Sequence, residues 1–222
     1  MEFRTLNANE IDCRVNTINE NGLTLLLYKD ARCDMNILDE TVGCMNWKRE
    51  HTRDNANCIV SIYNEKLKEW ISKEDTGTES FSEKEKGLAS DSFKRACVNW
   101  GIGRELYTAP FIWVGSDKAN IYNTGRKDKN GKDVYSTYDN FIVKSISYNE
   151  NREIDGLVIE NQKTKKVVFE LGKVIETYRQ QLIDYCKEHK LDTNEISRDY
   201  NLTKDSSEDD YKKALLNLKV GE

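Results

Sequence analysis

The sequence predicts an α+β fold, in which an antiparallel β-meander has a long helix packed across it (a β-β-β-α core) and a C-terminal extension adds a β-hairpin and helices. Three observations predict this class. Three extended segments follow one another with short turns between them, at 46–53, 57–63 and 67–76. Apolar residues then recur at helical spacing over 83–99. A second group of extended segments precedes a helical pattern at 174–189 and occupies 140–149, 154–160 and 165–171.

The 222 residues are expected to form one main domain with additions. Residues 1–115 are the predicted core domain, and residues 116–139 are predicted to be a polar loop. Residues 140–189 are predicted to form an accessory unit of strands and a helix. A polar, partly helical tail over 190–222 follows, with a short helix at 208–219.

Three elements are predicted before the meander. Residues 11–19 look weakly helical, and 22–28 (GLTLLLY) indicate a buried strand. Asp30 is a suitable N-cap for a helix over 31–42, and Gly43 is a suitable end for it.

The helix over 83–99 is predicted to begin at a capping box of Ser82 and Glu85. One face forms a mainly apolar stripe that must pack on the sheet: Leu88, Ala89, Ser92, Phe93, Ala96, Cys97 and Trp100. The opposite face holds three cations: Lys84, Lys94 and Arg95. Two interpretations stay open from spacing alone. The face is either an ordinary solvated one with an Asp91–Arg95 ion pair, or a basic surface that holds a phosphate backbone.

The helix is expected to end in a tight turn. Gly101 suits the left-handed position that terminates a helix, and Gly103 allows the chain to turn back sharply. Arg104 then lies near the helix C-terminus, where the dipole favours a cation. We therefore expect Arg104 to bind the helix end or a neighbouring subunit rather than DNA.

The net charge of −5 restricts how this chain could bind nucleic acid. A monomer that uses its whole surface for that purpose is usually basic. Any such binding must therefore come from a local groove, or from basic strips that are combined in an oligomer.

Other site classes are not favoured by composition. With His51 and His189 far apart, neither a metal site nor a histidine-based catalytic site is expected, and no cofactor is indicated. No apolar run approaches the roughly 20 residues of a membrane span, and no signal-peptide pattern is present, so a cytoplasmic protein without a membrane partner is expected. Six cysteines without a CxxC pair are expected to be reduced, small core residues: Cys13, Cys33, Cys44, Cys58, Cys97 and Cys186.

Two sequence blocks resemble a known family. The strings ASDSFKRA (89–96) and WGIGRELY (100–107) resemble the core helix and following turn of the Rad-fifty-two-type single-strand annealing proteins. The block YKDARCDMNILDETVG (28–43), followed by Asn46 and Trp47, is similar to that family's first helix and first meander strand. The family includes eukaryotic recombination mediators, the bacterial protein DdrA and phage recombinases of the Sak type. The resemblance covers roughly residues 20–115.

The resemblance implies a protein of phage or prophage type that binds single-stranded DNA and anneals complementary strands without ATP, in homologous recombination or DNA repair. It implies no enzymatic activity and no cofactor. Members assemble into rings or filaments, so a homo-oligomer in the bacterial host cytoplasm is expected. A recombinase or a single-strand-binding protein is a candidate partner.

The resemblance also assigns residues. Lys94 and Arg95 match the helix cations that line the family's inner DNA groove, and Arg32 is the counterpart of a second DNA-contacting arginine. Val98 stands where eukaryotic members have a further arginine. Charge alone adds further DNA-binding candidates, for which ordinary strand-edge charges that discourage aggregation are an equally good interpretation: Lys48, Arg49, Arg53, Lys66 and Lys68. Lys84 is a further candidate because it lies on the cationic face of the predicted helix.

Three alternatives remain at this point. The first is a single-strand-binding or recombinase-loading accessory protein without annealing activity. A metal-dependent nuclease is less favoured, because the acid pairs Asp39–Glu40 and Asp209–Asp210 are adjacent residues that do not face each other on a helix. The third is a purely structural oligomer.

Overall fold

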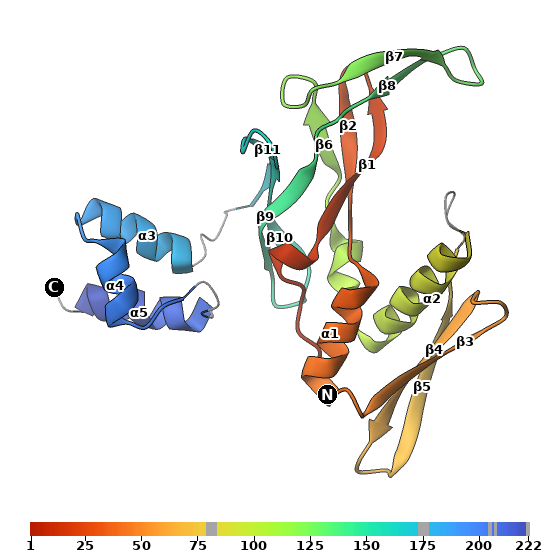
Figure 1. Cartoon of the computed structure of the whole chain (residues 1–222), viewed down its shortest axis with the longest axis horizontal. Coiled ribbons are helices and arrows are strands. Elements are labelled where there is room, and N and C mark those ends of the chain that lie inside the picture. Colours follow the sequence, from red (N-terminus) through yellow and green to blue (C-terminus); the bar gives the residue numbers. More distant parts are fainter. Residues whose placement is uncertain (79–83, 173–177, 204–205, 207, 221–222) are drawn as a thin grey trace. The chain divides into compact units, whose positions relative to one another are not determined.

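The computed structural model describes residues 1–78, 84–172, 178–203, 206 and 208–220, without the side chains of 84–86, 180, 208, 209 and 220. The chain forms two compact units, Met1–Gly172 and Lys173–Glu222. The first unit contains three antiparallel sheets and two long helices, and the second contains helices (Figure 1). The predicted α+β class is confirmed.

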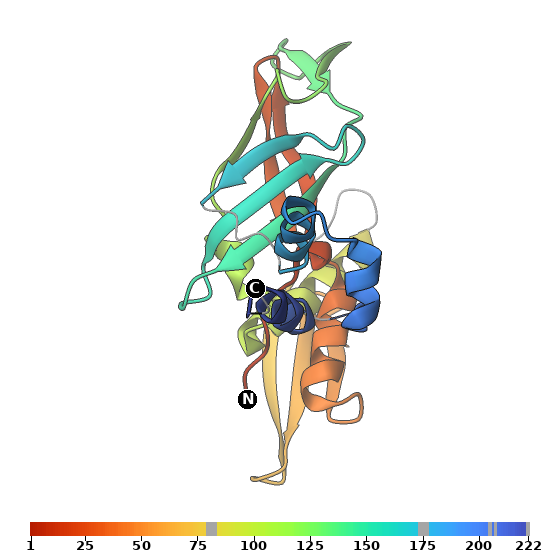
Figure 2. The same cartoon turned by 90° about the vertical axis from the view of Figure 1, so that its left-hand side faces the viewer.

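A six-stranded antiparallel sheet forms the larger part of the first unit, in the order β11-β10-β9-β1-β2-β6. Its strands are β1 (Asp12–Asn19), β2 (Gly22–Tyr28), β6 (Ile112–Gly115), β9 (Phe141–Tyr148), β10 (Ile154–Asn161) and β11 (Val167–Leu171). Strands β9 to β11 lie side by side in Figure 2, drawn in green to blue-green. The edge strands β6 and β11 contact each other, so the sheet curves round on itself.

Residues 11–19 were predicted to be weakly helical, and this prediction is wrong. Strand β1 occupies the segment and pairs with β2 from Asp12↔Tyr28 to Asn19↔Gly22. The side chain of Asn19 accepts hydrogen bonds from the backbone N–H groups of Asn21 and Gly22, which closes the hairpin. Pairing with the buried strand β2 outweighs the weak local preference of this polar segment.

Two predicted boundaries also need correction. The strands within 140–171 are not an accessory unit, because β9 pairs with β1 and the sheet extends through them. The predicted polar loop 116–139 contains a two-stranded hairpin, β7 (Tyr122–Lys127) and β8 (Asp133–Ser136). Its turn includes Gly131 at φ +77°, and the Asp128 carboxylate accepts two backbone N–H groups there. Short polar strands of this kind have too few apolar residues to be seen in a hydrophobic pattern.

Helix α1 (Ala31–Val42) confirms the prediction for this segment. The Asp30 side chain accepts the backbone N–H of Arg32 at 2.6 Å, and Gly43 follows the helix at φ +84°. The short 3-10 helix η1 (Ala8–Glu10) precedes the first strand.

The predicted meander and its helix are confirmed as β3 (Trp47–Thr52), β4 (Asn57–Asn64), β5 (Glu69–Thr76) and α2 (Lys84–Trp100). Helix α2 packs on β4 and β5, and Phe93, Ala96 and Cys97 are fully buried. The Trp100 indole N–H donates to the carbonyl of Val60 at 3.0 Å. The predicted capping residue Ser82 and the side chain of Glu85 lie outside the described residues.

One hydrophobic core joins all layers of the first unit. It includes Leu25 of β2, Ile37 of α1, Val60 of β4, Phe93 of α2 and Ile159 of β10. Because the six-stranded sheet and the meander contribute to the same core, their helices are held in fixed positions relative to both sheets.

The second unit contains α3 (Tyr178–Glu188), α4 (Thr193–Asp199) and α5 (Glu208–Val220) around its own small core. The predicted short helix at 208–219 corresponds to α5, whereas α4 was not predicted. The helix predicted over 174–189 begins at Tyr178 within the described residues. No helix in the described part of the chain has the length and apolar character to cross a membrane.

Replacing Phe93 by alanine is expected to lower the free energy of unfolding by about 3–5 kcal/mol, because a fully buried aromatic ring is removed and leaves a cavity. Chemical denaturation measures the change. Phe111→Ala is the matched control, since the Phe111 side chain is 77% exposed and its truncation is expected to have a small effect. Equal losses for the two variants would contradict the burial of α2 against the sheet.

Candidate nucleic-acid interface

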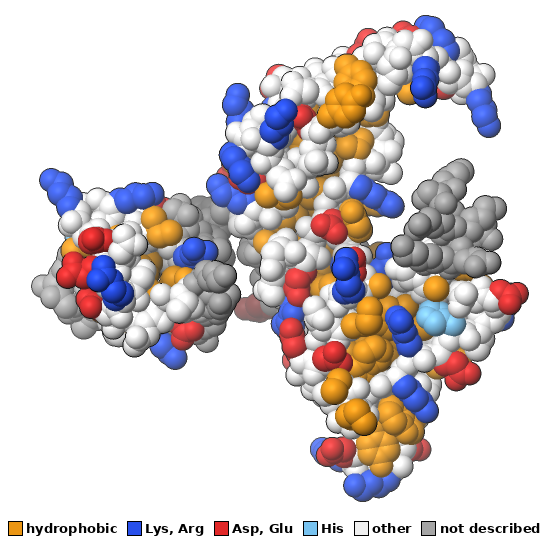
Figure 3. Space-filling view, viewed as in Figure 1, with side chains coloured by type: hydrophobic (Ala, Val, Ile, Leu, Met, Phe, Trp, Pro, Cys, Tyr) orange, Lys and Arg blue, Asp and Glu red, His pale blue; other side chains and the backbone are white. Residues whose placement is uncertain are grey.

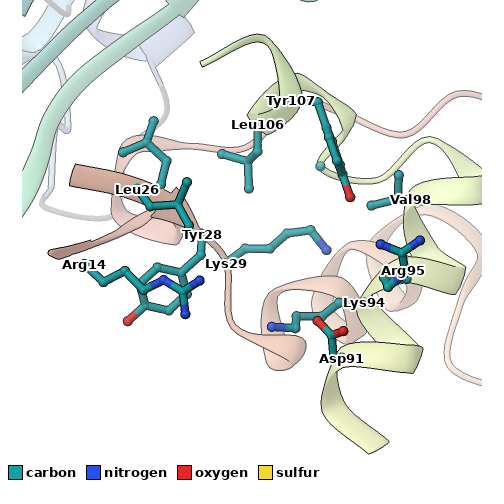
Figure 4. Close-up of a pocket in the computed structure, with 12 residues that line it drawn as sticks. Arg14, Leu26, Tyr28, Lys29, Asp91, Lys94, Arg95, Val98, Leu106 and Tyr107 are labelled. Atoms are coloured by element: carbon teal, nitrogen blue, oxygen red, sulfur yellow. The ribbon is translucent and has the colours of Figure 1, made fainter. Parts of the chain in front are cut away.

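A cleft of about 350 Å³ lies between the outer face of β1 and β2, helix α2, and the 3-10 helix η2 (Arg104–Thr108). Figure 4 shows side chains from all these elements extending into it. The volume is at the lower end of the range for small-molecule sites, roughly 300–1,000 Å³. The lining includes Arg14, Tyr28, Lys94, Arg95 and Tyr107.

Lys94 and Arg95 line the cleft because of the helix face on which they lie. Phe93 and Ala96 pack into the core, so the residues between them face away from it. Lys94 is half-buried at the cleft, and the Arg95 side chain is 45% exposed. Val98, also half-buried, lies on the same side of the helix. The structure therefore brings together the two cations that the resemblance selected.

The Asp91–Arg95 ion pair of the first interpretation is not formed, and both residues have partners farther away in the chain. Arg95 Nε lies 3.2 Å from Asp75 Oδ1 of strand β5. Asp91 instead accepts hydrogen bonds from the backbone N–H and the hydroxyl of Thr78, at 2.9 and 3.1 Å. An exposed pair such as Arg95–Asp75 contributes only about 0–1 kcal/mol, so an incoming phosphate can compete for the guanidinium.

Two tyrosine rings and an arginine complete the walls. Tyr28 follows the outward positions of β2 and is 37% exposed, and Tyr107 of η2 is 71% exposed. The Arg14 guanidinium carbon lies 5.7 Å from the centre of the Tyr28 ring. In Figure 4 the Tyr107 ring reaches toward Arg95. Sequence reasoning missed Arg14, Tyr28 and Tyr107 as site residues, although Tyr28 begins one resembling block and Tyr107 ends another.

A buried ion pair lies at the base of the cleft. Lys29 lines the cleft but is only 4% exposed, and its ammonium group binds Oδ1 of Asp34, which is fully buried. The other carboxylate oxygen of Asp34, Oδ2, has no hydrogen-bond partner. Burial raises the pKa of Asp34 to about 6, although the charges of Lys29 and Lys94 act in the opposite direction.

The tight turn after α2 makes room for Lys29. Gly103 has φ +71°, and a Cβ atom there would lie 2.2 Å from Cε of Lys29. Gly101 has φ +103° with open space around it, so its role is the left-handed backbone alone. Gly103 is therefore required for two reasons: its backbone is left-handed, and the aliphatic part of the Lys29 side chain packs directly against it.

Arg104 binds the end of α2, as expected. Its guanidinium donates to the carbonyl oxygens of Val98 and Asn99 at 2.8 and 2.9 Å. The Lys73 ammonium group donates to the same Asn99 carbonyl at 2.8 Å. Two cations therefore satisfy C-terminal carbonyl groups of the helix, where the dipole favours positive charge.

The remaining predicted residues do not gather at the cleft. Arg32 forms an ion pair with its own N-cap residue Asp30 at 2.8 Å and is not part of the cleft lining among the described residues. Arg53 lies in the β3–β4 turn, and Lys66 and Lys68 lie in the β4–β5 turn. The side chain of Lys84 lies outside the described residues.

Lys48 and Arg49 are neighbours on β3 and therefore point to opposite faces of the sheet. Lys48 lies 4.6 Å from the centre of the Trp70 ring, whereas the Arg49 guanidinium lies 4.8 Å from the centre of the Phe93 ring, on the face that α2 covers. Figure 3 shows basic side chains among hydrophobic ones over this sheet. The two residues therefore cannot line one groove together. Each forms a cation–π contact with an aromatic ring on its own face of the sheet.

In the part of the chain that the structure describes, no group of three or more His, Cys, Asp or Glu side chains is arranged to hold a metal ion. All six cysteines are free. Four of them, Cys33, Cys58, Cys97 and Cys186, are buried as expected for small core residues, whereas Cys44 is exposed.

Comparison of the chain with protein-family models, with curated proteins and with solved structures finds no match.

Gly103→Ala is expected to lower the free energy of unfolding more than Gly125→Ala does. Both glycines have nearly the same φ, +71° and +72°, but only the Cβ at position 103 would collide with Lys29. Left-handed backbone in a residue other than glycine costs about 1–3 kcal/mol, and the collision adds to this cost at position 103. Thermal unfolding of both variants measures the difference, and equal destabilisation would contradict the close packing of Lys29 on Gly103.

Proposed function

We propose that this protein binds single-stranded DNA in the cleft and promotes the annealing of complementary strands without ATP, as a homo-oligomer rather than as an enzyme. The observation that carries the proposal is the position of Lys94 and Arg95. These two cations line the same cleft as Arg14 and two exposed tyrosine rings. The resemblance of residues 28–47 and 89–107 to single-strand annealing proteins supports the same conclusion.

The residue types of the cleft suit single-stranded nucleic acid. Lysine and arginine attract phosphates without reading the base sequence, and aromatic rings stack on the flat faces of unpaired bases. In this arrangement the cations of α2 bind the backbone, and Tyr28 and Tyr107 offer ring faces to bases. Stacking leaves the hydrogen-bonding edges of the bases free, which is the condition for pairing with a second strand.

The acidic composition is compatible with this proposal, because the positive charge is local. Three cations lie at the cleft walls, and the one carboxylate among the wall residues, Asp91, already accepts two hydrogen bonds from Thr78. A single cleft of this volume holds a short stretch of DNA. Annealing therefore requires several protomers whose clefts follow one another along a strand, and the proposal includes a ring or a filament.

We place this activity in homologous recombination or DNA repair in the bacterial cytoplasm, as the resemblance to phage and prophage recombinases implies. The second candidate is a single-strand-binding or recombinase-loading accessory protein that does not anneal strands. The cleft supports it equally well as a binder. The rate of duplex formation between complementary oligonucleotides, with and without the protein and in the absence of ATP, separates the two. Binding without acceleration would favour the accessory protein.

The variant Lys94→Ala/Arg95→Ala is expected to lose single-strand binding and annealing while it keeps its fold and oligomeric size. Each removed phosphate contact should also reduce the slope of log K against log salt concentration by about 0.7. Fluorescence anisotropy with a labelled oligonucleotide measures both effects, and light scattering measures the oligomer.

The matched control is Lys66→Ala/Lys68→Ala, which removes the same charge from an exposed turn. We expect this control to bind DNA almost as well as the unmodified protein. If it lost binding while the Lys94/Arg95 variant retained it, the assignment of the cleft would be wrong.

Tyr107→Ala is expected to weaken single-strand binding by about 1–3 kcal/mol, the usual contribution of one base stacked on an aromatic ring. Because the side chain is 71% exposed, its removal should change thermal stability little. Tyr107→Phe keeps the ring and should retain the affinity. A loss of the same size in both variants would show that the hydroxyl group, and not stacking, is responsible.

A further inference from the structure

We propose that Lys29 is a further phosphate-binding residue of the cleft and that Asp34 neutralises it in the free protein. When DNA binds, a DNA phosphate replaces the Asp34 carboxylate as the counter-ion of Lys29. The Asp34 carboxylate then takes up a proton from solvent. This inference rests on the proposed function, because it assigns a role to the base of the same cleft. It predicts that DNA binding is coupled to proton uptake.

The position of Lys29 favours a contact with a bound phosphate. Its side chain lines the cleft, and in Figure 4 it extends toward α2 into the same space as Lys94. The close packing of its stem on Gly103 fixes the direction of the side chain. The lysine is therefore held at the base of the cleft rather than free to turn toward bulk water.

Asp34 is an incomplete partner for this lysine. The carboxylate is fully buried, one oxygen binds Lys29, and the other has no hydrogen-bond partner. An ionised carboxylate usually needs hydrogen bonds to most of its acceptor sites when it is removed from water. The carboxylate therefore takes up a proton more readily than an exposed one, and burial raises its pKa to about 6.

The charged and titratable groups around Asp34 come from three elements. Lys29 precedes α1, Asp30 is the N-cap of α1, and Lys94 lies on α2. The charge of Asp34 also acts on the thiols of Cys33 and Cys97, whose pKa values burial raises, so both stay protonated near neutral pH. Asp34 is therefore the member of this group that titrates near pH 6.

The direction of the coupling follows from electrostatics. A phosphate beside Lys29 and Lys94 adds negative charge near Asp34 and raises the pKa of its carboxyl group further. At pH values between the pKa of Asp34 in the free protein and its higher pKa in the complex, the complex therefore binds more protons than the free protein. Affinity for DNA must therefore rise as the pH falls from about 8 toward 6, by about tenfold for each unit by which DNA raises this pKa.

The experiment measures the dissociation constant of a thymidine oligonucleotide, whose bases do not titrate in this range, between about pH 5.5 and 8 at fixed salt. For the unmodified protein we expect binding to tighten about tenfold toward low pH. Calorimetry in two buffers of different ionisation heat should show proton uptake on binding. Because these measurements use the unmodified protein, they decide the question even if a variant fails to fold.

Two variants test whether Asp34 and Lys29 cause the pH dependence of DNA binding. Asp34→Asn keeps the shape of the side chain without its charge, and should bind at about pH 8 as tightly as the unmodified protein does at low pH, with little pH dependence. Lys29→Met keeps the stem without the ammonium group, and should bind more weakly at low pH. The double variant His51→Gln/His189→Gln is the control for the two histidines, and should retain the pH dependence.

Several outcomes overturn the inference. Affinity that does not change with pH, with no proton uptake, would mean that Lys29–Asp34 is a structural ion pair only. If the DNA affinity of Asp34→Asn still depended on pH but that of the histidine variant did not, the proton would be assigned to a histidine. Both results leave the proposed function intact, whereas absence of DNA binding at every pH would overturn the proposed function itself.

Discussion

The packing of helix α2 on the three-stranded sheet is the constraint on which the rest of the candidate site depends. Phe93, Ala96 and Cys97 have no exposed surface, and the Trp100 indole is hydrogen-bonded to β4. Because these contacts prevent rotation of the helix about its axis, Lys94 and Arg95 must face the opposite side. The hydrophobic core thus determines where the cations point, and Leu27 belongs both to this core and to the lining of the cleft.

The cleft also shows how an acidic chain can present a basic site. Several cations outside the cleft are engaged by local partners: Arg32 by Asp30, Arg104 by the carbonyl groups of α2, and Lys127 by Asp133. At the cleft, Lys94 and Arg14 face the open space, and Arg95 forms an ion pair with the half-buried Asp75. Electrostatic attraction falls off within about 8–10 Å at physiological ionic strength, so for the proposed DNA binding this local arrangement matters more than the net charge of −5.

The accuracy of the sequence predictions followed the strength of the local signals. Asp30 and Gly43 mark both ends of α1, and the apolar stripe of α2 has helical spacing, so both helices were predicted correctly. Strand β1 was missed because its exposed, polar residues depend on β2 and β9 as neighbours. The hairpin β7–β8 was missed because turn geometry and backbone hydrogen bonds form it with little apolar contact.

The sequence by itself determined the two main helices, the meander, and the place of Lys94 and Arg95 on the helix face opposite the core. These are consequences of periodicity and capping, which act over a few residues. Only the tertiary structure decided that Arg14, Tyr28 and Tyr107 join those cations, and that Lys48 and Arg49 point to opposite faces of their sheet. It also brought Gly103 against the stem of Lys29 and Asp34 against its ammonium group. The physical reason is that a cleft is formed by segments far apart in the chain, whose meeting depends on how the two sheets share one core.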